Sequence, residues 1–160
     1  MKITDEGKLA SAKGFANERR LLAALLERGY NASIVDLPHS TYDIVVESGN
    51  DIIRLQVKTV SKSGSIKFTG GLRGGVDREY KSGVKEYTQS TETSDAVVGV
   101  QSIMNNGDKS IDFWIVPTCL IEQLKQKSIS INRIPEAKNN WEIMELCKDE
   151  SYVFTVFRVN

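Results

Sequence analysis

The sequence has few of the residues that build disulfide scaffolds or zinc sites. Its 160 residues include two cysteines, Cys119 and Cys147, and one histidine, His39. The cysteines lack the spacing of metal ligands, so we expect two free thiols with a structural role in a reducing cytosol. His39 lies in a polar stretch, where we expect a bystander or a phosphate contact.

Long apolar runs are also missing. No apolar run reaches the ~18 residues of a membrane-spanning helix, and the first residues, MKITDEGK, lack the apolar core of a signal peptide. We therefore expect a cytoplasmic protein without membrane association. Hydrophobic residues make up 40% of the chain and charged residues 26%, as in ordinary globular domains, and the length fits one domain over residues 1–160.

The net charge is zero, but the charge is unevenly distributed. Residues 54–85 hold two acidic residues, Asp77 and Glu79, and eight basic ones: Arg54, Lys58, Lys62, Lys67, Arg73, Arg78, Lys81 and Lys85. The sum is 8 − 2 = +6, so the rest of the chain carries −6. Such a basic segment is typical of a surface that binds a phosphate backbone. Solvated loop charge is the alternative interpretation. The glycine-rich part, 70–83, has no P-loop pattern.

Residues 42–60, YDIVVESGNDIIRLQVKTV, predict a β-hairpin. Two β-rich runs flank the turn-forming residues 48–51, and Gly49-Asn50 fits a two-residue loop. In that register Asp43 lies opposite Gln56. Because side chains alternate between the faces of a strand, Gln56 and Lys58 point to the same side as Asp43, while the other face is apolar.

A helix is expected over residues 5–28, ending at Gly29. Phe15, Leu22 and Leu25 surround Glu18 at helical spacing, which predicts that Glu18 lies within the apolar stripe. A buried carboxylate requires a partner or a metal. Glu18 is therefore interpreted either as a carboxylate directed at Asp43 and Lys58, or as one that reaches solvent or pairs with an arginine.

The remaining pattern predicts alternating strands and helices. Strands are expected over residues 65–69, 95–100, 111–116, 128–134 and 152–159, and residues 31–36 are expected to form a strand or an extended connection. Helices are expected over residues 80–90, 118–127 and 135–149, with Thr118 as an N-cap. Residues 118–160 are expected to form an extension packed on the domain.

Asp43, twelve intervening residues and Gln56-Val57-Lys58, with the helical Glu18 upstream, resemble the PD-(D/E)XK nuclease superfamily, the restriction-endonuclease fold. Gln56 stands where that family usually has Asp or Glu, and Tyr42 where it often has Pro. The glutamine variant, the position of Glu18 and the small size are most like the group I intron-encoded homing endonucleases of this fold. The resemblance covers roughly residues 10–117 and implies an α/β domain with a mixed central sheet flanked by helices.

The resemblance also implies roles for these residues. Asp43, the Gln56 amide, the Val57 carbonyl and Glu18 would hold Mg²⁺, with Mn²⁺ as a possible substitute, because hard cations prefer oxygen ligands. Lys58 would stabilise charge on the phosphate or position the attacking water. Lys62, Lys67, Arg73, Arg78, Lys81 and Lys85 would contact the DNA backbone.

The expected function is that of a metal-dependent DNA endonuclease of homing or restriction type. One site cuts one strand, so cleavage of double-stranded DNA implies a homo-oligomer, a dimer or a tetramer. Two alternatives are a junction or repair nuclease of the same fold and a catalytically inactive DNA-binding protein. Gln56 is the best argument for the inactive protein.

Overall fold

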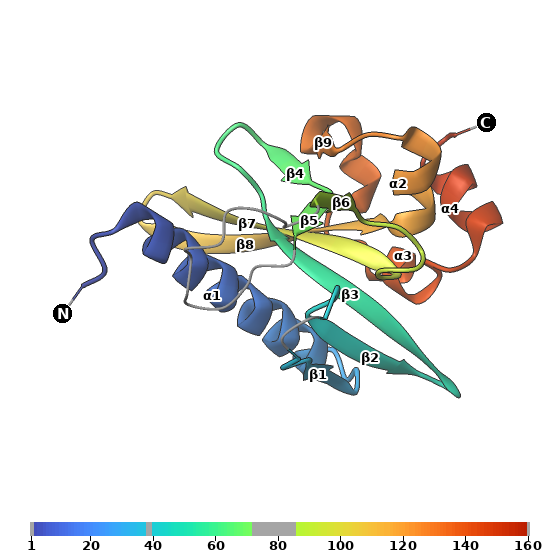
Figure 1. Ribbon diagram of the computed structural model, residues 1–160, viewed down its shortest axis with the longest axis horizontal. Helices are drawn as coiled ribbons and strands as arrows, with labels where there is room; N and C mark the ends of the chain where they lie inside the picture. The colour runs from blue at the N-terminus through green and yellow to red at the C-terminus, as the bar shows by residue number, and fades with distance from the viewer. Residues whose placement is uncertain (1, 38–39, 72–85, 160) are drawn as a thin grey trace.

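A five-stranded mixed sheet forms the centre of the computed structural model, which describes residues 2–37, 40–71 and 86–159 (Figure 1). In spatial order its strands are β1 (Ala32–Ile34), β2 (Ile44–Ser48), β3 (Asp51–Thr59), β7 (Ala96–Asn105) and β8 (Asp108–Pro117). Only the β3–β7 pair is parallel. The predicted mixed sheet flanked by helices is confirmed.

Two short antiparallel ribbons lie beside this sheet. One pairs β4 (Ser65–Lys67) with β9 (Ser128–Ser130), and the other pairs β5 (Thr69–Gly71) with β6 (Glu86–Thr88). The helix predicted over residues 80–90 is wrong for the residues that the structure describes, because residues 86–88 form the strand β6. The Tyr87 ring there occupies the space next to Gly70, where an added Cβ would lie 2.7 Å from the ring.

The central hairpin has the predicted register. Ser48 pairs with Asp51 and Ile44 with Leu55, and Gly49 adopts a φ of 61° in the loop. The backbone N–H of Asp43 donates to the carbonyl of Leu55 at 2.8 Å, which extends the pairing toward Gln56. A two-residue loop with a positive φ matches the twist of the strands, and this fixes which side chains share a face.

Helix α1 (Glu6–Glu27) lies along the β1 and β3 side of the sheet (Figure 1). Its N-cap is Asp5, whose side chain accepts a hydrogen bond from the Lys8 amide. The helix buries Leu21, Ala24 and Leu25, together with Asn17, whereas Phe15 is 60% exposed. The predicted stripe around Glu18 is therefore wrong in its centre: the buried face is rotated toward Asn17 and Leu21, and Glu18 lies at its edge.

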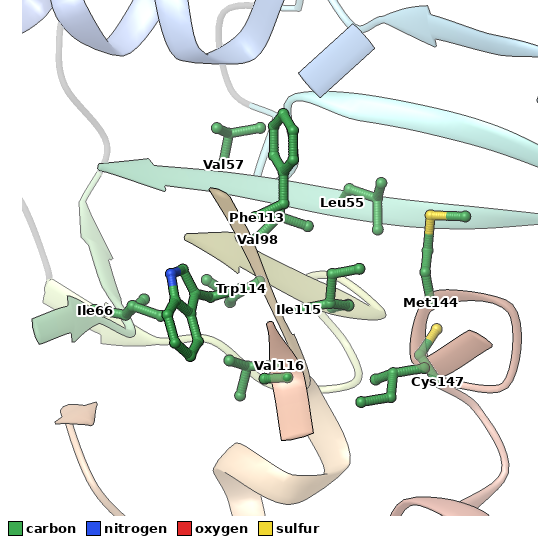
Figure 2. Close-up of a cluster of buried hydrophobic side chains, with 14 of the residues drawn as sticks. Leu55, Val57, Ile66, Val98, Phe113, Trp114, Ile115, Val116, Met144 and Cys147 are labelled. Carbon is green, nitrogen blue, oxygen red and sulfur yellow. The ribbon is translucent and has the colours of Figure 1, made fainter. Parts of the chain in front are cut away.

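The C-terminal helices complete the hydrophobic core. Besides α2 (Thr118–Leu124), they are α3 (Trp141–Glu145) and α4 (Glu150–Val156), with two 3-10 turns at Ile131–Arg133 and Pro135–Ala137. Figure 2 shows Met144 and Cys147 from this region in the same cluster as Leu55 and Ile115. No helix within the described residues is long and apolar enough to cross a membrane.

The strand predicted over residues 152–159 is wrong, because most of this segment is helix α4. Asp149 is the N-cap, and its side chain accepts a hydrogen bond from the Tyr152 amide at 3.1 Å. The helix buries Val153, and Phe157 one turn later is also buried. The β-branched and aromatic composition favours a strand, but the cap and the apolar contacts four residues apart stabilise a helix.

Two further C-terminal predictions are corrected. The helix over residues 135–149 is interrupted at Asn139, whose φ is 50° and whose side chain accepts from the Phe113 amide of the edge strand β8 at 2.8 Å. Thr118 is not an N-cap: the cap residue of α2 is Pro117. The Thr118 hydroxyl instead donates toward the carbonyls of Ser94 and Asp95, which lie 2.7 and 3.1 Å away.

Both cysteines are buried free thiols, and we expect them to be unreactive in the folded protein. Burial raises the pKa of Cys119 to about 11 and that of Cys147 to about 12. At pH 8 a thiol reagent such as DTNB should label neither cysteine until urea unfolds the chain, because the thiolate is the reactive form. Rapid labelling of the native protein would contradict this prediction.

The folded state also retains thiol protons that the unfolded state releases, so the free energy of unfolding should fall as the pH rises above the ordinary thiol pKa of 9.0.

Candidate functional site

Asp43 and Gln56 meet at the base of the central hairpin, as their register predicts. The Gln56 Nε2 donates to Asp43 Oδ2 at 2.5 Å, and the Val57 backbone N–H donates to the same oxygen at 2.7 Å. The Gln56 Nε2 also lies 3.3 Å from the Val57 carbonyl oxygen. The base of the hairpin thus holds one carboxylate, one amide and one backbone carbonyl close together.

Lys58 belongs to the same cluster. Its positive charge lowers the pKa of Asp43, which places the ammonium group within electrostatic reach of the carboxylate. Lys58 pairs with Gly99 of β7 in the sheet. Ile66 packs against Gly99, where an added Cβ would lie 2.6 Å from its Cδ1, so an apolar side chain covers the sheet next to Lys58.

Glu18 comes to the site from helix α1. The preceding residue, Asn17, is 3% exposed and donates from Nδ2 to Thr59 Oγ1 at 2.8 Å, which ties the helix to the end of β3. Burial raises the pKa of Glu18, and the nearby Asp43 charge raises it further, while Arg19 lowers it. Glu18 thus feels the charge of Asp43, and it pairs with Arg19 at 3.5 Å.

The environment of Asp43 disfavours its negative charge. Burial raises its pKa, and this outweighs the opposing effects of the Val57 N–H, the Lys58 charge and the Gln56 amide. The site therefore holds two half-buried carboxyl groups with raised pKa values, and the Asp43 charge acts on Glu18. A bound cation would relieve the cost of holding both carboxyl groups in their charged form.

Two residues of the site were missed from the sequence, Gln89 and Tyr87. Gln89 follows β6 and is 1% exposed, and its amide nitrogen lies 3.4 Å from the Gln56 Oε1. Burial raises the pKa of Tyr87, hydrogen bonding to Gln89 lowers it, and the Asp43 charge raises it, so the phenol also lies near the carboxylate. Both residues lie in a segment that the sequence pattern assigned to a helix, and nothing in that pattern distinguishes them.

The basic segment is only partly described. Lys62 and Lys67 are exposed, as a phosphate-contacting surface requires. Arg54 has a structural role, because its guanidinium pairs with the buried Asp95 at 2.8 Å and donates to backbone carbonyls of residues 91 and 92. Arg73, Arg78, Lys81 and Lys85, as well as His39, lie outside the described residues.

The donor set fits a hard divalent cation with few charged ligands. It offers the carboxylates of Asp43 and Glu18, both with raised pKa values, and the neutral carbonyl oxygen of Val57. Gln56 directs its Nε2 toward Asp43 and its oxygen toward Gln89. Oxygen ligands of this kind suit Mg²⁺ or Mn²⁺. Among the described residues no group of three or more acidic, histidine or cysteine side chains could hold a metal ion.

A mixed sheet of this topology, flanked by helices, is the restriction-endonuclease-like fold. The structure is similar to that of a bacterial homing endonuclease, I-Ssp6803I, with a TM-score of 0.63 and 13% sequence identity over 88% of this chain and 94% of the other. At this identity the similarity establishes the fold alone. No curated protein sequence matches the chain.

The family model of the PD-(D/E)XK endonucleases matches residues 10–116, and the chain belongs to this family. The match includes Glu18, Asp43, Gln56 and Lys58.

Proposed function

We propose that the protein is a metal-dependent DNA endonuclease of homing type that hydrolyses phosphodiester bonds in double-stranded DNA. The observation that carries the proposal is the convergence of Asp43, Gln56 and Lys58, with Glu18 approaching from α1, in a member of an endonuclease family. A homing endonuclease shares the fold, so the homing type is the first one to test.

In the proposed site, Asp43, Glu18, the Gln56 amide oxygen and the Val57 carbonyl would hold Mg²⁺, with Mn²⁺ as a substitute. A bound divalent cation supplies charge neutralisation on the phosphate and a nucleophilic water. Lys58 stabilises the negative charge that develops on the phosphate. Gln56 removes one negative charge relative to a carboxylate at that position, so the metal depends more strongly on Glu18.

Exposed basic residues would position the DNA backbone. Lys62 lies between β3 and β4, and Lys67 is the last residue of β4, so both lysines come soon after the strand that carries the site. The basic residues 73, 78, 81 and 85 belong to the same proposed surface by sequence. Phosphate contacts fix the register of the duplex without reading its sequence. Cleavage of both strands requires two sites, and we propose a dimer or a tetramer.

Plasmid cleavage tests the proposal directly. Supercoiled plasmid carrying the target site, incubated with the protein, should be nicked and linearised with Mg²⁺ or Mn²⁺ and remain intact with EDTA. The target itself comes from sequencing the ends cut from a random DNA library. Binding without cleavage at any metal concentration would identify the alternative, an inactive DNA-binding protein, whereas preference for branched DNA would indicate a junction or repair nuclease.

A further inference from the structure

We propose that Gln89 is a positioning residue that fixes the orientation of the Gln56 side chain in the candidate active site. The inference rests on the proposed function for its catalytic consequence, but the orientation itself is a property of the metal-free protein. In the proposed site Gln89 contacts neither DNA nor metal and acts through Gln56.

The amide of Gln89 can be oriented in one way only. Its Nε2 lies 3.4 Å from the backbone carbonyl of Thr41, which can only accept a hydrogen bond. Its Oε1 accepts from the hydroxyls of Thr93 at 2.6 Å and Ser94 at 2.9 Å. Turning the amide over would place two carbonyl oxygens against each other and leave the Ser94 hydroxyl proton without this acceptor.

The same reasoning fixes the amide of Gln56. Its Nε2 faces two oxygens that accept, Asp43 Oδ2, which also accepts from the Val57 N–H, and the Val57 carbonyl. Its Oε1 faces the Nε2 of Gln89 at 3.4 Å. Donor faces acceptor at each point, so Gln89 selects the orientation in which Gln56 directs its nitrogen to Asp43.

This arrangement lets Gln56 orient the Asp43 carboxylate, a proposed metal ligand, because the Gln56 Nε2 donates to Asp43 Oδ2. A carbonyl oxygen has two lone pairs, so Gln56 Oε1 retains one while the other accepts from Gln89. Partners that orient metal ligands in this way commonly affect metal affinity or activity by about 10- to 100-fold. Gln89 is 1% exposed, and Thr93 and Ser94 hold its Oε1. Its amide therefore forms a rigid support for the half-buried Gln56 side chain.

The first test uses the metal-free protein and NMR of the Gln56 side-chain amide, assigned by its loss in Gln56→Ala. In the wild type the two amide protons should give separate signals and exchange with water about tenfold more slowly than those of the exposed Gln123. Gln89→Met should abolish this protection. A Gln56 amide that exchanges like that of Gln123 in the wild type would overturn the proposal, whether or not the protein cuts DNA.

The second test is a double-mutant cycle on single-turnover cleavage at saturating protein. Gln89→Met should lower the rate about 10- to 100-fold in the wild-type background and change it less than about twofold in the Gln56→Ala background. DNA affinity should stay constant. An equal loss in both backgrounds would show that Gln89 only supports the fold.

Thr118→Val is the matched control. It removes a buried hydroxyl that bonds the backbone of residues 94 and 95, without touching either glutamine amide. It should lower the melting temperature but leave the Gln56 signals and the cleavage rate unchanged. If Gln89→Met does not fold, Gln89→Glu keeps the acceptor for Thr93 and Ser94, removes the amide protons and should give the same loss of Gln56 protection.

Discussion

Asp43→Asn is expected to abolish DNA cleavage while leaving DNA binding largely intact. The substitution removes the carboxylate that lies at the centre of the site, 2.5 Å from the Gln56 amide and 2.7 Å from the Val57 N–H. We expect the single-turnover rate to fall by more than about 100-fold, because even residues that only orient metal ligands contribute about 10- to 100-fold. Gel-shift titration measures binding in parallel.

The variant should remain folded, since an asparagine oxygen still accepts from the Val57 amide. Asp51→Asn is the matched control, because Asp51 begins β3 at the other end of the hairpin and its exposed side chain bonds Lys148. That control should cut DNA at the wild-type rate. If folded Asp43→Asn protein retained cleavage, the proposed site would be in the wrong place.

Lys58→Ala is expected to lower the single-turnover rate by roughly 100-fold, the scale of losing one electrostatic stabiliser of the transition state. Lys58 lies close enough to Asp43 to lower the pKa of that carboxyl, and it points to the same side of the hairpin as Gln56. The rate at saturating protein separates this chemical effect from an effect on DNA affinity.

Lys62→Ala provides the comparison. Lys62 is exposed, four residues further along the chain and beyond the end of β3 at Thr59. Its loss should weaken binding and flatten the slope of log affinity against log salt by about 0.9 if it contacts one phosphate. The saturated rate should not change. Equal losses of saturated rate in the two variants would remove the proposed distinction between catalysis and backbone binding.

The central part of the site could be predicted from the sequence because it depends on local rules. Alternating apolar residues and a Gly-Asn loop define one hairpin register, and that register places Asp43 opposite Gln56 and on the same face as Lys58. Strand pairing has a period of two, so one correctly placed turn determines every side-chain direction along both strands. Glu18 could be placed on a helix, but not on the correct side of it.

The C-terminal region shows where local patterns were insufficient. The segment from Tyr152 to Val159 has the composition of a strand, yet Asp149 caps a helix there and Val153 and Phe157 are buried in the core. Propensity differences between helix and strand are small compared with the free energy of burying such side chains. Packing therefore decided the secondary structure.

By itself, the sequence determined the hairpin, its register and the identity of Asp43, Gln56 and Lys58 as one group. Only the tertiary structure decided that Asn17 anchors α1 so that Glu18 approaches Asp43, and that Gln89 lies behind Gln56. Gln89 is separated from Gln56 by 33 residues, and its contacts depend on how β6 and the following turn pack beside β3. Hydrogen bonds between such distant residues follow from the packing of whole elements, which no local pattern specifies.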